Sequence, residues 1–421
     1  MSKGWYAKLR IYNGSDFMNN SAGIDVSKGK SMVSVLRPFG EVVALPFTVH
    51  HTSSELGQLA NYLKSLDGET RVVMEHTGRY YEPVAQALHD AGVFVCAVNP
   101  KLIKDYGNNS LRKVKTDKAD SKKIARYGLD NWTELREYSS MDAIRYQLKT
   151  MNRQYGLFSK NKTILKNNLI SLLDQTYPGA NALFDSPVRD DGSEKWVDFI
   201  ASFWHVDCVR NMSLAAFTER YQKFCKRHGY NFSAKKAEEI HSEAKEKWVM
   251  VPKDSVTKFL IQQAVDQLNA CSKSVEMLRI EMNRLASHLP EYPVVMAMYG
   301  VGERLGPQLM AEIGDVTRFA HKGSLAAFAG VDPGANQSGT KEAKSNRASK
   351  CGSPALRKAL FNVMDCLIKK QPMDDPVYLF MDKKRAEGKP YLVYMTAGAN
   401  KFLRIYYGRV TEYLATLPPA E

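Results

Sequence analysis

Two carboxylates stand inside a strongly basic stretch, KTDKADSKKIARY, which runs from Lys115 to Tyr127. Asp117 and Asp120 are three residues apart, so on a helix both side chains project from one face. Like unit charges about 4 Å apart repel by roughly 4 kcal/mol at an effective dielectric near 20, unless a cation lies between them. The pair therefore either binds a metal ion, or consists of a helix N-cap, Asp117, and a solvated first-turn acid, Asp120.

Two further acids lie in strand-like segments. Asp25 falls in GIDVSK, and Glu75 ends the run RVVME. If these strands are neighbours in a sheet, both carboxylates lie over its surface, beside a helix that carries Asp117 and Asp120. Oxygen ligands from separate elements suit Mg²⁺, and two such ions about 3.5 to 4 Å apart drive phosphodiester chemistry. We therefore predict one or two Mg²⁺ ions on Asp25, Glu75, Asp117 and Asp120.

Cationic and aromatic side chains accompany these acids along the chain. Lysine and arginine bind phosphates, and aromatic rings stack on bases. On that basis we expect nucleic-acid contacts from Lys101, Lys104, Lys115, Lys118, Lys122 and Arg126, with Tyr80 and Tyr81 as candidates for stacking. For the two tyrosines and for Lys101 and Lys104, an ordinary surface or core position is an equal alternative.

The composition narrows the class of protein. The 421 residues include 59 Lys and Arg against 45 Asp and Glu, a net charge of +14, which implies a polyanionic partner, most commonly nucleic acid. No apolar run approaches the roughly 18 to 20 residues that span a bilayer, so we expect an intracellular protein without a membrane segment. The six cysteines lack metal-ligand spacing, and we expect reduced thiols and no zinc site.

The elements that must position the acids are predicted in the first third of the chain. Strand-like runs cover residues 22–36, with a turn at 28–30, and residues 41–49, 71–75 and 93–98. Helical spacing covers residues 53–66 and 80–92. Leading strands followed by alternating strands and helices predict an α/β domain with a mixed sheet.

Two long heptad patterns follow. The first has apolar positions at Ile144, Leu148, Met151, Tyr155, Phe158, Leu165, Leu169 and Leu172. The second has Leu260, Ala264, Leu268, Cys271, Val275, Leu278, Met282, Leu285 and Leu289. Such helices form either an antiparallel hairpin or an oligomer contact, and periodicity alone does not separate the two. Between them lies a segment with Trp196, Trp204 and Trp248, which we interpret as an inserted subdomain of unknown role.

The last third contains two motifs suited to phosphate. A glycine turn in MYGVGERLGPQ resembles a helix-hairpin-helix turn, in which Gly300 and Gly302 would present backbone N–H groups; helix capping and packing are the alternative. A Gly/Ser/Asn-rich loop then carries cations that we predict to contact nucleic acid: Lys341, Lys344, Arg347, Lys350 and Arg357.

The order of several motifs resembles the DEDD transposases of the insertion-sequence family numbered 110, the bridge-RNA-guided recombinases. The motifs are GIDVSK, MEHTGRY, VNPKLIKDY, KTDKADSKKIARY, GVGERLGPQLMAEIGD, LAAFAGVDPGANQSG and RASKCGSPALRKAL. The resemblance covers nearly the whole chain. It implies an RNase H-like domain related to Holliday-junction resolvases, whose four metal-binding acids match Asp25, Glu75, Asp117 and Asp120.

The strand and heptad patterns, taken with the resemblance, predict a domain plan. Its N-terminal extension and its long segment between the heptad helices depart from the usual family outline. An N-terminal extension, 1–21, precedes the RNase H-like DEDD domain, 22–135. A first coiled-coil helix, 136–177, an inserted helical subdomain, 178–254, and a second coiled-coil helix, 255–290, follow. The chain closes with a mainly helical transposase domain, 291–421. The fold class expected is α/β plus α.

The family carries a nucleophilic serine in the SG loop, which matches Ser338 best, with Ser345 and Ser349 as competitors. The resemblance implies a covalent phosphoserine intermediate, donor and target double-stranded DNA, a noncoding guide RNA, and a dimer or tetramer in the bacterial cytoplasm at the nucleoid. Two alternatives stay open. One is a junction endonuclease that uses metal-activated water, and the other is a non-catalytic nucleic-acid-binding module with structural acids.

Overall fold

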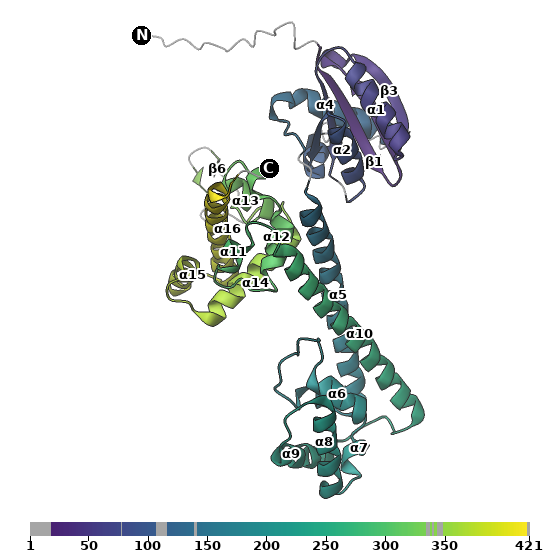
Figure 1. Ribbon diagram of the computed structural model, residues 1–421, viewed down its shortest axis with the longest axis vertical. Coiled ribbons are helices and arrows are strands. Elements are labelled where there is room, and N and C mark those ends of the chain that lie inside the picture. The colour runs from purple at the N-terminus through teal and green to yellow at the C-terminus, as the bar shows by residue number, and fades with distance from the viewer. Residues whose placement is uncertain are drawn as a thin grey trace. The chain divides into compact units, whose positions relative to one another are not determined.

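The computed structural model describes residues 18–76, 78–106, 116–138, 141–333 and 348–418, and the backbone of 337–338 and 341–342. The chain divides into two compact units, residues 1–140 and 141–421. Each unit is described by itself below, and Figure 1 labels their elements.

The first unit is built on a mixed five-stranded sheet in the order β3-β2-β1-β4-β5. The strands β1, β2 and β3 are antiparallel neighbours, whereas β4 runs parallel to β1 and β5 runs parallel to β4. Their bounds are β1 Asn20–Ser27, β2 Lys30–Leu36, β3 Val42–His50, β4 Thr70–Glu75 and β5 Phe94–Val98. The predicted mixed sheet is confirmed, and each predicted strand lies within one or two residues of its expected place.

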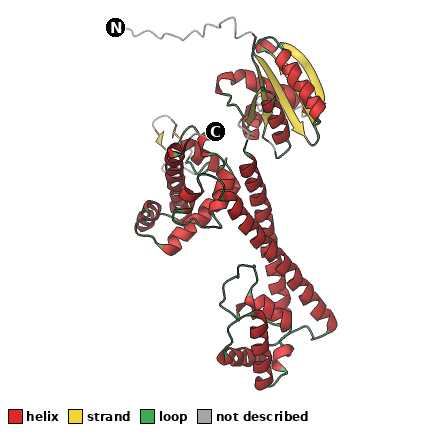
Figure 2. Cartoon of the chain, viewed as in Figure 1, coloured by secondary structure: helices red, strands yellow, loops and turns green. Residues whose placement is uncertain are grey.

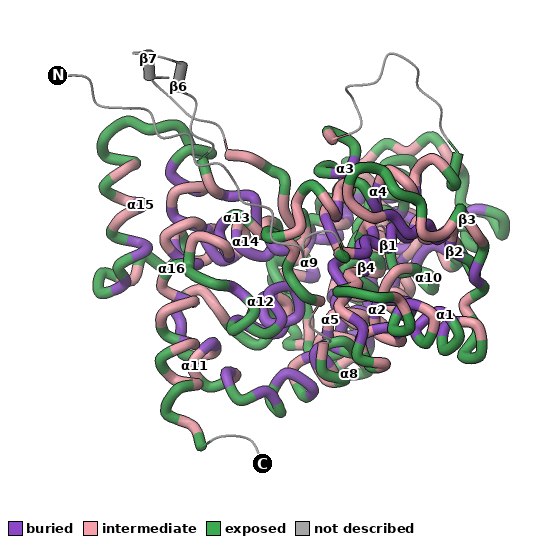
Figure 3. The backbone as a smooth tube through the Cα atoms, turned by 90° about the horizontal axis from the view of Figure 1, so that it is seen from above, coloured by how far each residue is buried: buried purple, intermediate pink, exposed green. Residues whose placement is uncertain are grey.

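Helices cover both faces of this sheet (Figure 2). The helices α1, Ser53–Ser65, and α2, Tyr81–Asp90, pack on one face over a core that includes Ile24, Val72 and Met74. On the other face, α4, Asp117–Asp130, contacts β1, β2 and β4, and contacts the short helix α3, Pro100–Tyr106. Figure 3 shows the central strands β1 and β4 as buried, as expected for strands covered on both sides.

The second unit is organised around two long helices, α5, Ala143–Thr176, and α10, Ser255–Ala286, which pack against each other. Leu148, near the start of α5, shares a core with Met282, near the end of α10. Leu169, near the end of α5, shares a second core with Ile261, near the start of α10. The pair is therefore an antiparallel hairpin within the chain. Leu260 is an exception to the predicted seam, because it is exposed and Ile261 is buried in its place.

The segment between the long helices forms a cluster of helices with its own aromatic core. The helices are α6 Lys195–Ser202, α7 Asp207–Arg210, α8 Leu214–His228 and α9 Ala234–Glu246. Phe199, Phe203, Phe217 and Tyr221 are fully buried and pack ring against ring. These helices share their core with the end of α5 and the start of α10. Their assignment to a separate inserted subdomain stays a prediction.

The remaining helices pack around the other end of the hairpin. They are α11 Tyr292–Met296, α12 Gly306–Ile313, α13 Lys322–Ala329, α14 Pro354–Lys370, α15 Pro376–Ala386 and α16 Tyr391–Thr416. Their shared core includes Leu309, Leu360, Met395 and Phe402. None of the described helices combines the length and the apolar character needed to cross a membrane. An α/β part followed by a mainly helical part is confirmed, while the RNase H-like and coiled-coil assignments stay predictions.

Candidate acidic site and serine loop

The strand register places Asp25 beside Glu75. The parallel ladder of β1 and β4 pairs Ile24 with Met74, and each acid is the next residue of its strand. Paired residues on neighbouring strands lie about 4.8 Å apart and present their side chains on the same face. Both acids are half-buried. Two carboxylates predicted from separate motifs therefore lie next to each other at one end of the sheet.

The face that these acids share is the face that α4 covers. A Cβ atom at Gly23 would lie 2.2 Å from the carbonyl oxygen of Ser121 and 2.3 Å from the backbone nitrogen of Ala125, so the helix touches the strand backbone there. Since side chains alternate along a strand, Asp25 points to the same side as Gly23. The buried hydroxyls of Ser34 and Ser121, 2.7 Å apart, join β2 to α4 on this face as well.

The contacts also fix the direction of α4 over β1. Ser21 lies against Gly128, where a Cβ atom would be 2.3 Å from the serine Oγ, and Gly23 lies against Ser121 and Ala125. One step further along β1 is Asp25, and one turn back along α4 are Asp117 and Asp120. The strand end that carries Asp25 and Glu75 thus runs toward the helix end that carries the other two acids.

The N-terminus of α4 shows how those two acids are held. Thr116 is the N-cap, and its hydroxyl accepts a hydrogen bond from the Ala119 N–H at 3.2 Å. The interpretation of Asp117 as the N-cap is therefore wrong. Asp117 is exposed and Asp120 half-buried, and both lie in the first turn, where the helix dipole stabilises negative charge.

Four carboxylates form a donor set that suits Mg²⁺, which prefers oxygen ligands. The half-burial of Asp25 and Glu75 side by side fits such an ion, because neighbouring carboxylates repel unless a cation offsets their charge. Across the described part of the chain, however, no three His, Cys, Asp or Glu side chains are grouped closely enough to bind one metal ion as they stand. The ladder brings together two of the predicted ligands, and the helix presents the other two from the facing element.

Most of the cationic residues predicted near the acids are accessible. Lys101 and Lys104 on α3 are exposed, as are Lys118 and Arg126 on α4, while Lys122 is half-buried. Tyr80 is exposed just before α2, and Tyr81, the first residue of α2, is half-buried. Lys115 lies outside the described residues. Exposure is what phosphate contact requires, so these predictions stay open.

A hydrogen bond holds α3 to the far end of α4. The Tyr106 hydroxyl donates to the Asp130 carboxylate, and the rings of Tyr106 and Tyr127 meet edge to face at 5.5 Å. Burial and the Asp130 carboxylate raise the pKa of the Tyr106 hydroxyl to about 12. This contact fixes the helix that carries Lys101 and Lys104 against the helix that carries two of the acids.

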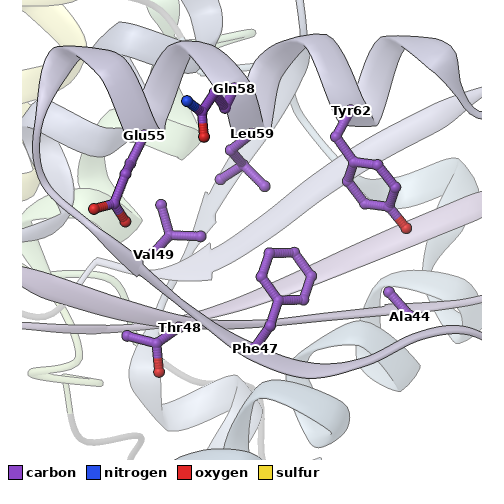
Figure 4. A pocket seen from close by; sticks show the side chains of 8 residues that line it. All are labelled: Ala44, Phe47, Thr48, Val49, Glu55, Gln58, Leu59 and Tyr62. Atoms are coloured by element: carbon purple, nitrogen blue, oxygen red, sulfur yellow. The ribbon is translucent and has the colours of Figure 1, made fainter.

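A pocket in the first unit lies away from these residues. It opens between β3 and α1 and is lined by Phe47, Leu59 and Tyr62 with Glu55 at one side (Figure 4). These residues belong to the sheet face covered by α1, opposite the face of Asp25. The Glu55 carboxylate accepts from the His50 backbone N–H at 2.6 Å. The pocket is therefore separate from the acidic site.

Ser338 lies in a two-residue strand, β6, Gln337–Ser338, paired antiparallel with β7, Lys341–Glu342. The backbone of these residues is described, but the side chains of 334–347 are not. Lys344, Arg347 and the competitor Ser345 fall outside the described residues. The side-chain predictions for Ser338 and Lys341 are therefore open.

Well-defined contacts hold the base of this loop, which we call the neck, residues 330–333 and 348–353. Pro333 and Ala348 form a β-bridge, and the Ser349 hydroxyl donates to the Asp332 carboxylate at 2.8 Å. The hydroxyl of Ser349 thus has a structural partner, which weakens its case as the nucleophile. Lys350 is exposed with a φ of 53°, in the left-handed region.

Two predicted phosphate contacts have structural partners. Arg357 is half-buried, and its guanidinium donates to the Ala329 carbonyl at 2.9 Å. Gly300 has a φ of 75°, and a Cβ atom there would lie 3.0 Å from the Val363 carbonyl. Gly302 instead faces open space in the turn between α11 and α12. The turn is therefore accessible at Gly302, whereas glycine at position 300 serves packing.

Sequence reasoning missed three contributors to the acidic site. Gly23 permits the close approach of α4, Thr116 caps that helix, and Ser34 bonds to Ser121. A glycine inside a strand is a recognised sign of a close backbone approach, and a threonine before an acidic first turn is typical of an N-cap. The serine pair has no comparable signal, since it joins residues 87 positions apart.

Comparison with known proteins adds two family matches. The DEDD transposase model of IS110 matches residues 22–178, and that of the transposase IS116/IS110/IS902 family matches residues 292–378. The first range contains all four acids, and the second contains Ser338. The two matches together cover more than half of the chain and follow one another in the expected order.

Two relatives match over most of their length. The pilin gene-inverting protein of Moraxella bovis is 23% identical over 341 residues, which are 81% of this chain and 80% of the relative. The pilin gene-inverting protein of Moraxella lacunata matches with the same identity and the same coverage. With both family models matched in order around the acids and the SG loop, the chain belongs to the IS110 transposase family and is a DNA recombinase.

Proposed function

We propose that this transposase mobilises its insertion sequence through a covalent link between Ser338 and DNA, with Asp25, Glu75, Asp117 and Asp120 as ligands of one or two Mg²⁺ ions. The observation that carries the proposal is the β1–β4 register, which makes Asp25 and Glu75 neighbours on the face covered by α4. Such ions, when bound, polarise the scissile phosphate and stabilise the charge that develops on it.

The strand-cleavage step is a transesterification. The Ser338 Oγ attacks the phosphorus of the scissile phosphodiester and forms a serine–phosphate bond. The bond between phosphorus and one sugar oxygen breaks, and that oxygen leaves with the proton from the serine. Rejoining reverses the step with the hydroxyl of another strand. Because serine is a weak nucleophile at its ordinary pKa, the cationic residues of the loop would assist by stabilising the phosphate charge.

The cationic surface would hold the substrate strands. Lys101 and Lys104 on α3 are exposed, as are Lys118 and Arg126 on α4 and Lys350 at the neck. These side chains and the net charge of +14 support binding of donor and target DNA together with a noncoding guide RNA that selects them by base pairing. Binding should then weaken with salt, with a log–log slope of about −0.9 for each duplex phosphate contacted.

Assembly into a dimer or tetramer is supported by exposed apolar residues on the long helices. Leu157 and Ile164 on α5, and Met277 and Ile280 on α10, are 50% to 60% exposed. Residues at such spacing on paired helices can pack against a second hairpin. Sedimentation of the purified protein tests this, since replacing Met277 and Ile280 by serine should shift the protein toward the monomer.

The decisive experiment looks for the covalent adduct. Purified protein with its co-purifying RNA is mixed with labelled element-end DNA and Mg²⁺, and protease-sensitive adducts are separated on a denaturing gel. The wild-type chain and Ser345→Ala should form the adduct, and Ser338→Ala should not. Cleavage without any adduct would instead support a junction endonuclease that uses activated water. An adduct with Ser338→Ala would remove this serine from the mechanism.

A further inference from the structure

A buried carboxylate lies behind the neck of the serine loop. Glu312, in α12, is 4% exposed and accepts three hydrogen bonds from two other parts of the unit. Asn152 donates at 2.7 Å and Arg153 at 2.8 Å, both from α5. Ser353 donates from its hydroxyl at 3.1 Å. A buried charge with this many partners is costly to disturb, because losing one partner leaves the others unsatisfied.

Ser353 links this carboxylate to the neck. It is the N-cap of α14, and its Oγ accepts from the Leu356 N–H at 3.2 Å. A serine hydroxyl has one hydrogen to donate, and here that hydrogen goes to Glu312. The Ser353 backbone N–H donates to the Phe328 carbonyl at 2.8 Å, at the end of α13. Glu312 therefore fixes the orientation of the last residue of the neck.

The neck has no spare room around these contacts. A Cβ atom at Gly352 would lie 2.0 Å from the Phe328 carbonyl oxygen, and one at Gly330 would lie 2.7 Å from the Gly352 nitrogen. The Lys350 N–H donates to the Gly330 carbonyl at 3.1 Å. We therefore expect a small displacement of Ser353 to shift neck residues 348–353 together, because closely packed segments transmit strain.

A second buried acid of the same unit provides a natural comparison. Glu291 is also paired with an arginine of α5, Arg145, through a two-point contact. Arg145 additionally bonds to the Asp142 carboxylate at 2.8 Å. None of the hydrogen bonds described for Glu291 involves the neck. Both glutamates are thus buried and paired with an arginine of α5, although Arg145 is buried and Arg153 is exposed. Of the two acids, only Glu312 has a described bond to Ser353.

We propose that Glu312 is a positioning residue for recombination: through Ser353 it orients the neck of the loop that carries Ser338, and through Asn152 and Arg153 it ties that neck to α5. This role rests on the proposed function of Ser338. The carboxylate itself takes no part in the reaction. A misplacement of about 1 Å at a reacting group can cost about a hundredfold in rate, so the effect on chemistry should exceed the effect on stability.

The test separates capping from positioning. In Ser353→Asp the new carboxylate can still cap α14, but it cannot donate to Glu312 and repels it. Glu312→Gln removes the charge, and in the double variant the glutamine amide can donate to the aspartate. We expect adduct formation to fall about ten- to a hundredfold in either single variant and to recover partly in the double variant. Glu291→Gln, the matched control, should keep the wild-type rate.

Hydrogen exchange of the DNA-free protein gives a readout independent of catalysis. The amides of Ser349, Lys350 and Ser353 should exchange faster in Glu312→Gln and Ser353→Asp than in Glu291→Gln. Normal adduct formation by Ser353→Asp, or unchanged neck exchange in both variants, would overturn the positioning role. If Ser338→Ala still forms the adduct, the proposed nucleophile fails, while faster neck exchange would still show that Glu312 orders the neck.

Discussion

The acidic site and the serine loop are supported in opposite ways. Asp25 and Glu75 lie in paired strands, and Asp117 and Asp120 lie in a capped helix pressed against those strands. Ser338 lies in a two-residue strand beyond a neck, and the described contacts hold the neck. The acids are therefore positioned by regular hydrogen bonding and close packing. The contacts described for the serine loop lie at its base, where backbone bonds and a few side chains hold the neck.

This difference indicates which substitutions should disturb the acidic site and which should disturb the serine loop. Regular elements place metal ligands within the narrow tolerance that coordination demands, and only packing defects disturb them. A loop held at its base depends on individual hydrogen bonds such as Ser349 to Asp332. Variants should therefore separate into those that damage the sheet and helix and those that leave folding intact but misplace the loop.

The largest effect is expected at the acids. Asp120→Asn should reduce recombination by about a thousandfold or more, equivalent to about 4 kcal/mol, because it removes one charge from the proposed metal ligands. Folding should be little affected, because Asp120 is not the helix cap and the loss of its interaction with the helix dipole costs about 0.3 to 1 kcal/mol. Asp130→Asn, at the other end of α4, serves as the control and should keep most of the activity. Recombination rates in a plasmid assay make the measurement, and full activity of Asp120→Asn would reject this site.

The next effect is expected where the helix meets the strand. Gly23→Ala should lower the free energy of unfolding of the first unit by about 3 kcal/mol, because the new methyl group would meet the backbone of Ser121 and Ala125. Gly57→Ala is the matched control, since a Cβ atom there meets nothing within 4 Å. Denaturant titration measures the free energy of unfolding of the two variants, and hydrogen exchange in β1 and α4 measures the local stability where the helix meets the strand. Equal stability of the two variants would contradict the close approach.

A smaller effect is expected at the start of α4. Thr116→Ala should cost about 1 kcal/mol of helix stability by removing the N-cap, and Thr116→Ser should restore most of it. The same alanine variant should raise the Mg²⁺ concentration needed for recombination, because Asp117 and Asp120 occupy the turn that frays. Exchange rates of the Ala119 and Asp120 amides report on the cap. Unchanged Mg²⁺ dependence would separate capping from metal binding.

The smallest effect concerns pH. The pKa of Tyr106 is raised to about 12, so the folded state favours the protonated hydroxyl more than the unfolded state does. The stabilisation is complete below pH about 10, the ordinary pKa of tyrosine, and declines as pH rises toward 12. Tyr106→Phe should cost about 0.5 kcal/mol at neutral pH, discounted for partial exposure, and the cost should shrink at alkaline pH. A pH-independent difference between the two proteins would refute this account.

More of the fold than of the candidate site could be predicted from the sequence. The strands were predictable because apolar residues alternate between turns, and the long helices because Leu148, Leu169 and Leu268 recur at heptad spacing. Periodicity left open whether those helices pair within the chain, since hairpins and oligomers share one pattern. It also assigned Leu260 to the seam, where the neighbouring Ile261 is buried.

The four acids of the candidate site could likewise be predicted only in part. Their sequence positions were predictable, but their relation depends on the parallel pairing of β1 with β4, which joins residues 50 positions apart. Asp117 was given a capping role that Thr116 fills, because both residue types favour that position. The role of Glu312 could not be predicted from the sequence. A single glutamate in an apolar helix shows no residue pattern that identifies its three hydrogen-bond donors, which lie far away in the chain.

The length of the hairpin would amplify any bend in it. A helix of 34 residues, such as α5, is about 51 Å long at 1.5 Å per residue. A bend of only about 5° at one end would therefore displace the other end by about 4 Å, slightly more than the 3.4 Å between successive bases on a strand. A bend of that size would therefore shift the helical cluster, α6 to α9, by about the spacing of one nucleotide.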